Sequence, residues 1–496
     1  MENNNNKMQT TSLDPLDVKD ESFSVRLKRF SERYGKESIG SYYQQFFGHG
    51  SVPSKAFTRV LLKLIERNFP EADLQELRQN FAKEQFIFTA NHGGFENHPQ
   101  LTAGSLLTCM GAYLTGHSAV FLTCAALTPT HVTMPAGFML HALRPDLKRS
   151  QLRFLSNKYN EVFINHCPFP DLSIAKKRVQ ALPEGALLPH ELNVIEKLQL
   201  NTQAASFSDA LLQHNAHSYE EALSERFPGL KCYFADIDEL ASLLLIEDLK
   251  EHGPFYDLLS SPKLVAELIV QMANSGQAWH SAQIGLNADP GRYTAGTVLF
   301  YCLNEKFEHS SLGCRIDDKD GKTTITLLNH KGFVLELTPD NVLQGLLQGR
   351  LHPNTFTVNV LLSLFHHCTL AGGIFFDGYI HKLIGIPAKL LSVPMPEGML
   401  ERRVQSVMLP FKCLNEQARG SFDEARPLLH IDLLAKKRFS SAELDAVLSA
   451  PLCSALPLSL SEVYFGVELT PQEAAARHDE MLQLLRADSP CVLRFD

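Results

Sequence analysis

A long stretch of the sequence, from Asn97 to Leu143, contains no aspartate, glutamate, lysine or arginine. A segment without charges either crosses a membrane or lies buried inside a protein. Residues 106–127 are long enough to span a bilayer, but glycines, threonines and a histidine interrupt the apolar run. A buried helix over 100–114 followed by a buried strand over 119–124 explains the stretch better. This feature therefore favours a parallel α/β sheet over a membrane span.

The residues around this helix complete a β-α-β unit. The apolar run 86–89 predicts a first strand, and Pro99 suits the first turn of the helix that follows. Strand, helix and strand in this order predict parallel pairing with a right-handed crossover. A third strand is expected over 161–165. The predicted fold class is α/β, with a Rossmann-like parallel core sheet.

Changes in composition along the chain divide it into segments around this core. The expected segments are a disordered leader (1–20), a helical N-terminal region (21–82), the first half of the α/β core (83–175), a mostly helical insertion or cap (176–280), the second half of the core (281–390) and a C-terminal extension (391–496). The leader is polar and lacks the apolar centre of a secretion signal. In the second half of the core, a hairpin is expected from 323–328 and 333–337, followed by a helix over 340–348 capped by Thr338.

Composition limits the class of function. With 496 residues, 44% of them hydrophobic and 20% charged, the chain has the make-up of a globular protein with a sizeable core. A formal net charge of −9 disfavours binding to nucleic acid or to an anionic membrane. The ten cysteines include no CxxC pair, so we expect reduced thiols in the cytoplasm.

The loop after the first strand carries the residues best suited to chemistry. His92 is followed by Gly93 and Gly94, and His98 stands at the start of the next helix. Glycines allow close approach of the backbone to a ligand, and a helix N-terminus attracts anions. An imidazole can transfer a proton or contact an oxyanion near neutral pH. We therefore expect His92 and His98 to be catalytic, with His92 as the preferred acid–base group.

A metal site is an alternative use of the same loop. Glu96 lies between the two histidines, and a third ligand would come from His117, His131 or His166. The spacing is not that of HExxH, and the sequence fixes no third ligand, so a metal is not favoured. No GxSxG, Walker A or GxGxxG motif occurs in a suitable context, which leaves hydrolase triads and ordinary dinucleotide sites without support.

Two segments resemble the bacillithiol synthase family, which adds cysteine in the synthesis of a low-molecular-weight thiol. The stretch 89–94 with Pro99 is similar to that family's Thr-Gly-Gln-Gln-x-Gly with a proline five residues later. Pro353-Asn354, Gly372-Gly373 and Tyr379 are similar in order to a later Pro-Asn turn, a Gly-Gly pair and a tyrosine. The family's acidic segment after the second core strand has no counterpart in 123–131, which contains no carboxylate.

The resemblance implies a ligase- or transferase-like enzyme that joins an amine or thiol metabolite to a carbonyl-bearing or activated partner at an anion-binding pocket. It implies substrate contacts from both sides of that pocket, by Thr89, Asn91, Gly93, Gly94, Asn354, Gly372, Gly373 and Tyr379. A nucleotide is a candidate cofactor, and the expected partner is a small molecule. The alternatives are a non-catalytic relative that binds a metabolite or a protein, and the His-ligated metalloenzyme.

Overall fold

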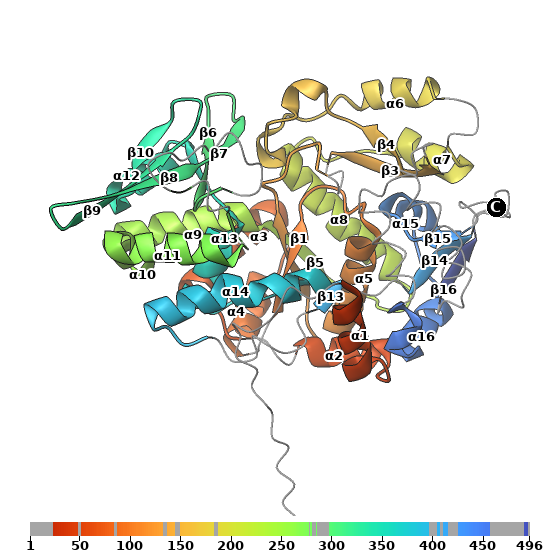
Figure 1. Ribbon diagram of the computed structural model, residues 1–496. Coiled ribbons are helices and arrows are strands. Elements are labelled where there is room, and N and C mark those ends of the chain that lie inside the picture. Colours follow the sequence, from red (N-terminus) through yellow and green to blue (C-terminus); the bar gives the residue numbers. More distant parts are fainter. Residues whose placement is uncertain are drawn as a thin grey trace, which may run out of the picture.

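The computed structural model of the protein describes residues 23–47, 51–83, 87–131, 136–143, 149–182, 187–276, 278–279, 284, 297–395, 404–406, 410–414, 425–456 and 491–494. Within these residues, five strands form a parallel sheet in the middle of the molecule (Figure 1). From one edge to the other they are β13 (Val404–Ser406), β12 (Thr369–Gly373), β1 (Ile87–His92), β2 (Ala119–Cys124) and β5 (Cys232–Asp236). All neighbouring strands pair in parallel.

The chain builds this sheet outward from β1 in two directions. It first adds β2 and then β5 on one side, and later returns to add β12 and β13 on the other side. The direction of winding therefore reverses between β1 and β12. Because the strands are parallel, the carboxyl ends of β1 and β12 lie at the same edge of the sheet. In open α/β sheets, ligands bind in the crevice at this point.

Among the described residues, four helices make the main contacts with β2 and β5, and α14 (Ile374–Leu391) contacts β12 and β13 on the other side of β1. The four are α3 (Lys55–Asn68), α5 (Pro99–Leu114), α8 (Phe207–Leu223) and α9 (Ile237–Glu251). Helices α5 and α8 contact each other, as do α3 and α9, and all four contact β2 or β5. Helix α5 is buried from Pro99 to Ala112 apart from Gln100. Burial on all sides explains why this part of the sequence carries no charge.

The helix expected over 100–114, the strand over 119–124 and their parallel pairing with the first strand are confirmed by α5, β2 and β1. The first strand extends further than expected and ends at His92. The third strand expected over 161–165 is wrong, because Ile164–His166 is a short 3₁₀ helix. Its place is taken by β5, so the segment 176–280 contributes α8, β5 and α9 to the core.

Smaller elements surround the sheet (Figure 1). The remaining helices are α1 (Phe23–Tyr34), α2 (Ile39–Phe46), α4 (Leu74–Lys83), α6 (Leu172–Gln180), α7 (Pro189–Lys197), α10 (Pro254–Leu259), α11 (Pro262–Ser275), α12 (Pro339–Leu347), α13 (Thr355–Val360), α15 (His430–Lys436) and α16 (Ser441–Ser449). The remaining strands are β3 (Gly137–Leu143), β4 (Arg149–Arg153), β6 (Phe300–Leu303), β7 (His309–Ser311), β8 (Gly313–Lys319), β9 (Lys322–Leu328), β10 (Val334–Glu336), β11 (Leu351–Pro353), β14 (Phe411–Leu414), β15 (Ala425–Pro427) and β16 (Cys491–Arg494).

Two local predictions in the second half of the chain are confirmed. Strands β9 and β10 pair antiparallel as the expected hairpin. Helix α12 begins at Pro339, and the hydroxyl of Thr338 caps it by accepting a hydrogen bond from the backbone N–H of Asn341. In the described part of the chain, no helix combines the length and apolar character that a membrane span requires. The leader over 1–20 lies outside the described residues.

Candidate active site at the carboxyl edge of the sheet

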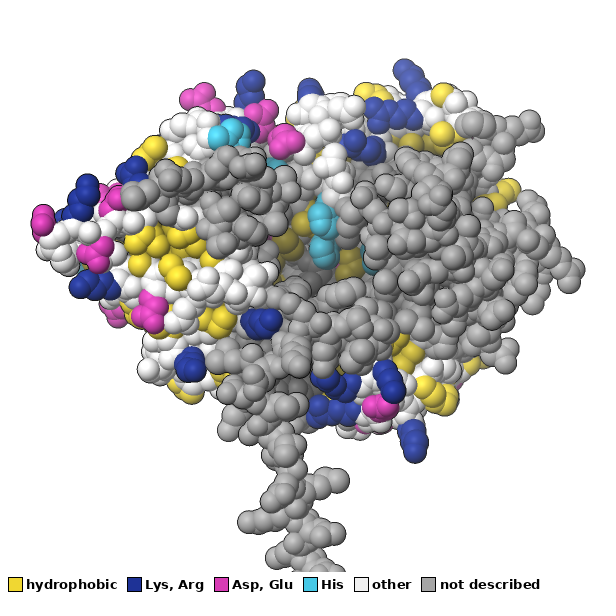
Figure 2. All heavy atoms as spheres, in the orientation of Figure 1, with side chains coloured by type: hydrophobic (Ala, Val, Ile, Leu, Met, Phe, Trp, Pro, Cys, Tyr) yellow, Lys and Arg dark blue, Asp and Glu magenta, His cyan; other side chains and the backbone are white. Residues whose placement is uncertain are grey.

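Three neighbouring strands end in side chains that can take part in chemistry. The last residues of β1, β2 and β5 are His92, Cys124 and Asp236. His92 is opposite Cys124 in the β1–β2 register, and Asp236 is opposite Thr123 in the β2–β5 register. The three residues therefore follow one another along the carboxyl edge of the sheet. Figure 2 shows histidine side chains in a hollow near the centre of the visible face.

The imidazole of His92 is held in a neutral state. Its ring stacks on that of His131, with ring centroids 5.1 Å apart and an angle of 27° between the planes. Burial, with smaller contributions from His131 and His98, lowers the pKa of His92 to about 3. The Nδ1 atom of His92 is buried and has no hydrogen-bond partner among the described residues. Buried polar atoms are normally paired, so this nitrogen has an unmet hydrogen bond.

Two glycine pairs lie at the carboxyl ends of the neighbouring strands β1 and β12. The Gly93 N–H donates to the Cys124 carbonyl at 2.6 Å, and a Cβ on Gly93 would lie 2.8 Å from that oxygen. Gly94 has a φ of +95°, which favours glycine. Gly372 and Gly373 are at the end of β12, the neighbour of β1 on the other side, and Gly373 is the N-cap of α14. The second pair therefore ends a strand and leads directly into a helix.

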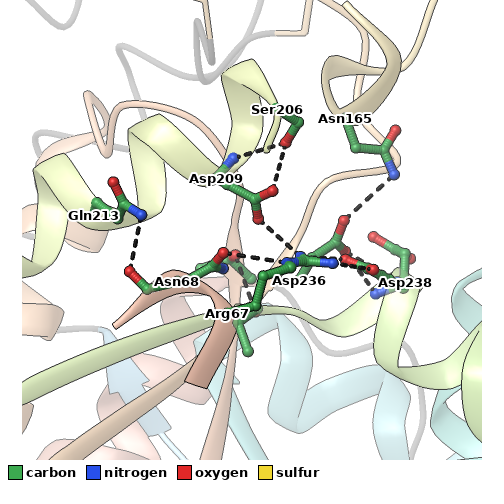
Figure 3. Close-up of polar contacts among 11 residues, drawn as sticks. Arg67, Asn68, Asn165, Ser206, Asp209, Gln213, Asp236 and Asp238 are labelled. Carbon is green, nitrogen blue, oxygen red and sulfur yellow. Dashed lines mark hydrogen bonds and ion pairs between the residues drawn. The ribbon is translucent and has the colours of Figure 1, made fainter. Parts of the chain in front are cut away.

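Two aspartates after β5 hold the neighbouring backbone in place (Figure 3). Asp236 caps α9, since its Oδ1 accepts from the N–H groups of Asp238 at 2.8 Å and Glu239 at 3.2 Å. Its Oδ2 accepts from Nδ2 of Asn165 at 3.3 Å. Burial, followed by the charges of Asp238 and Glu239, raises the pKa of Asp236 well above its usual value. Asp236 thus keeps its proton to a higher pH than an exposed aspartate does.

Asp238 connects the end of β5 to the segment that follows β2. Its Oδ2 accepts hydrogen bonds from the backbone N–H groups of Ala125 at 2.7 Å and Ala126 at 2.9 Å. Burial, followed by the charges of Asp238 and Asp236, raises the pKa of the Cys124 thiol well above its usual value. A cysteine of this kind is a packed thiol and not an activated nucleophile.

The edge of the site next to β5 is formed by a tyrosine and two histidines. Burial, with smaller contributions from Cys124 and Asp238, raises the pKa of Tyr301 to about 12. Burial, followed by the charge of His352, lowers the pKa of His166 to about 4. The Oδ1 atom of Asn165 is buried without a partner among the described residues. This side of the site therefore combines uncharged rings with an unsatisfied amide oxygen.

The sequence-based interpretation missed Asp236, Asp238 and Asn165. The signal for the two aspartates was the short apolar run 232–235 followed directly by Asp-x-Asp, which places carboxylates at the carboxyl end of a buried strand. Residues 123–131 lack carboxylates, but the tertiary structure brings the Asp238 carboxylate onto the backbone of that same segment. The acidic groups of the site are thus supplied by a later strand.

The structure gives the positions of four further residues that were expected to bind the substrate. Thr89 and Asn91 lie on β1 and Tyr379 on α14, but their side chains are outside the described part of the structure. Asn354 caps α13, since its Oδ1 accepts from the Thr357 N–H at 2.9 Å and its Nδ2 donates to the Thr297 carbonyl at 2.5 Å. Contacts of these four residues with a substrate remain predictions.

Replacing Asn354 by alanine is expected to lower the free energy of unfolding by about 1–3 kcal/mol, because the cap and the bond to Thr297 are lost together. Urea denaturation measures this change. Asn341→Ala is a matched control on an exposed helix turn, with an expected change of about 0.5 kcal/mol. An Asn354→Ala protein as stable as the wild type would show that the cap contributes nothing.

The geometry gives no support to a metal site in this loop. Glu96 is fully buried, and its carboxylate accepts a hydrogen bond from the Tyr219 hydroxyl on α8. His98 is the N-cap residue of α5, and its side chain does not cap that helix. Among the residues that the structure describes, no group of three or more His, Cys, Asp or Glu side chains is arranged to hold a metal ion.

Comparisons with known proteins add no further information on the site. No protein-family model, curated protein or solved structure matches the chain. A functional assignment therefore depends on the geometry of the carboxyl edge and on the resemblance of its motifs.

Proposed function

We propose that the protein is a cytoplasmic biosynthetic enzyme with a Rossmann-like core, similar to bacillithiol synthase. It binds an anionic small molecule at the carboxyl edge of the sheet and joins an amine or thiol to a carbonyl-bearing or activated partner. Numbered in chain order, the five parallel strands lie in the spatial order 3-2-1-4-5, which supports a doubly wound core. All ten cysteines are free, which agrees with a reducing compartment.

The main support for the proposal is His92 Nδ1, which has no hydrogen-bond partner among the described residues and lies where the strand order reverses. Helices α5 and α14 both begin near this edge: α5 follows the loop that contains Gly93 and Gly94, and α14 follows the Gly372-Gly373 end of β12. Helix N-termini present free N–H groups and a partial positive charge, so this corner favours an anion. A nucleotide or another phosphate-bearing molecule is the class of ligand that such a corner accommodates.

The pKa values of two side chains suggest their roles. A neutral imidazole is a hydrogen-bond donor that can stabilise an oxyanion, which suits the lowered pKa of His92. The raised pKa of Asp236 makes its carboxylate a stronger proton acceptor than that of an ordinary aspartate. As the amine or thiol adds to the carbonyl carbon, its proton passes to ionised Asp236, and the new oxyanion accepts a hydrogen bond from His92.

The first test measures the binding of inorganic pyrophosphate by isothermal titration calorimetry. We expect the wild type to bind it and His92→Ala to bind at least tenfold more weakly, since the imidazole donor at the anion corner is lost. His330→Gln, which changes an exposed histidine, serves as the control. Failure of the wild type to bind inorganic pyrophosphate would contradict the anion pocket.

Turnover is tested with cysteine and other small amines and thiols as acceptors. His92→Ala is expected to lower turnover by about 10²–10⁴-fold with the fold intact. Unchanged turnover in a folded His92→Ala protein would remove His92 from the mechanism. Anion binding without turnover of any amine or thiol would instead favour the non-catalytic relative.

A further inference from the structure

Two thiols from distant parts of the chain are in contact inside the protein. Cys109 lies on α5, and Cys232 is the first residue of β5, 123 positions later in the sequence. Their Sγ atoms are 3.3 Å apart, and the two residues are 0% and 1% exposed. Asp236, at the other end of β5, belongs to the carboxyl-edge site. The thiol pair is therefore separate from the proposed active site.

The contact between two sulfur atoms distinguishes this pair from other buried thiols. Three of these donate to backbone carbonyl oxygens at 3.7 to 3.9 Å, namely Cys167, Cys302 and Cys368. Sulfur is a weak hydrogen-bond acceptor, so the contact between Cys109 and Cys232 gains little from hydrogen bonding. A disulfide has an S–S distance of about 2.05 Å, and the two atoms need to approach by only about 1.3 Å to reach it.

The position of Cys232 in the sheet provides a route to solvent. Strand β5 lies at the edge of the five-stranded sheet, and Cys232 begins it. The turn before it is exposed at Pro228, Gly229 and Lys231, and Gly229 has a φ of +78°. The end of an edge strand next to an exposed turn opens at a much lower free energy than the whole fold. We therefore expect local opening of this end to expose Cys232 to small solutes.

In the closed state the surroundings keep the pair as thiols. Burial, followed by the contact with Cys232, raises the pKa of Cys109 well above its usual value, and the charges of Glu96 and Glu220 act in the same direction. The thiolate is the nucleophile in cysteine oxidation, so a thiol that keeps its proton reacts slowly. Oxidation therefore has to pass through the open state, in which Cys232 reaches water.

We propose that Cys109 and Cys232 are a site of reversible oxidation, at which hydrogen peroxide produces a disulfide between α5 and β5. The exposed Cys232 thiolate attacks a peroxide oxygen and becomes a sulfenic acid, and the hydroxide that leaves takes up the thiol proton as water. After the strand closes, the Cys109 sulfur attacks the sulfenic sulfur, and the S–OH oxygen leaves with the Cys109 proton as a second water.

The electrons and protons of this reaction balance. Two thiols lose two electrons and two protons, and one peroxide molecule is reduced to two molecules of water. A dithiol such as dithiothreitol returns the pair to thiols by exchange. The disulfide closes a long loop between α5 and β5, which restricts the unfolded chain and raises resistance to urea. The proposal goes beyond the proposed function and does not depend on it.

The test uses the full chain with Cys453→Ser, which removes an exposed cysteine. The folded protein is treated with hydrogen peroxide, the remaining thiols are alkylated in denaturant, and a non-reducing digest is analysed by mass spectrometry. We expect one pair of peptides joined through Cys109 and Cys232, lighter by two hydrogen atoms than the separate peptides and released by dithiothreitol. Absence of this pair, or joining of either cysteine to a different one, would overturn the proposal.

Variants connect the disulfide to stability. Peroxide is expected to raise the urea midpoint of the Cys453→Ser protein, and dithiothreitol to return it to the starting value. Cys109→Ala is expected to abolish this rise, with Cys232→Ala as a second variant if the first does not fold. Cys368→Ala, at a buried thiol that donates to a carbonyl, is expected to keep it. An equal rise in Cys109→Ala and Cys232→Ala would overturn the proposal.

The rate of disulfide formation tests the open state. Urea at concentrations below the unfolding midpoint is expected to speed the reaction about fivefold or more, because it favours opening of the end of β5. A disulfide that forms only above the midpoint would belong to the unfolded chain, and that result would overturn the proposal.

Discussion

Replacing Asp238 by alanine is expected to lower the free energy of unfolding by about 2–5 kcal/mol. The carboxylate is 2% exposed and accepts from the N–H groups of Ala125 and Ala126. Its removal leaves two buried donors unsatisfied, at about 1–3 kcal/mol for each. Urea denaturation at pH 7 measures the loss, provided that the dependence of free energy on urea concentration is unchanged.

Two further variants separate the possible causes. Asp238→Asn retains an acceptor oxygen, so it is expected to recover most of the stability while lowering the pKa of Asp236 through the loss of a neighbouring charge. Asp318→Ala removes an exposed carboxylate from β8 and is expected to change stability by about 0.5 kcal/mol or less. A wild-type free energy of unfolding in Asp238→Ala would show that the two hydrogen bonds do not hold this edge together.

Acidification from pH 7 to pH 5 is expected to destabilise the protein by several kcal/mol through its buried histidines. Burial, with the charge of His217, lowers the pKa of His214 to about 4, and burial with the charge of His214 lowers the pKa of His430 well below its usual value. Neither ring nitrogen of His430 has a partner among the described residues. On acidification, these two histidines therefore take up protons in the unfolded chain before they do so in the folded protein.

The lowered pKa values of these histidines determine whether acid stabilises or destabilises the fold. The stabilisation by each neutral histidine is complete above the unfolded pKa of about 6.5 and is lost as the pH falls toward the folded value, at about 1.4 kcal/mol per pH unit. Asp236, with a raised pKa, acts in the opposite direction, because the folded protein binds its proton more tightly than the unfolded chain does. Urea midpoints measured between pH 7.5 and pH 5 report the net slope.

Replacement of the His214 and His430 rings tests whether these two histidines cause the acid sensitivity. His214→Phe/His430→Phe is expected to flatten the dependence of stability on pH by up to two protons, since phenylalanine does not titrate. His330→Gln, at an exposed histidine, is expected to keep the wild-type slope. An unaltered slope in the double variant would mean that other groups cause the acid sensitivity.

Local chemistry was sufficient to predict several elements of the fold. Pro99 marks the start of α5, and Thr338 with Pro339 marks the start of α12, because caps and first-turn prolines act within a few residues. The charge-free stretch indicated burial on all sides, which α5 and β2 show. The Gly93-Gly94 turn after the first strand was also recognisable, because a positive φ and a close backbone approach both require glycine.

The wrong prediction of a third strand over 161–165 shows where local chemistry is insufficient. Residues 161–165 and 231–234 are both short apolar runs, and periodicity alone does not separate them. The second run forms β5 because α8 and α9 on either side of it allow a crossover onto the sheet next to β2. Asp236 and Asp238 reach the site only through this pairing.

The sequence by itself determined the starts of α5 and α12, the burial of the charge-free stretch and the glycine turn after His92, since these depend on residues that are near one another in the chain. The tertiary structure alone decided which strands are neighbours, that Gly372-Gly373 lies beside β1, and that Asp238 binds the backbone after β2. Strand pairing and the partners of buried polar groups depend on contacts between distant segments, and these are selected by the packing of the whole core.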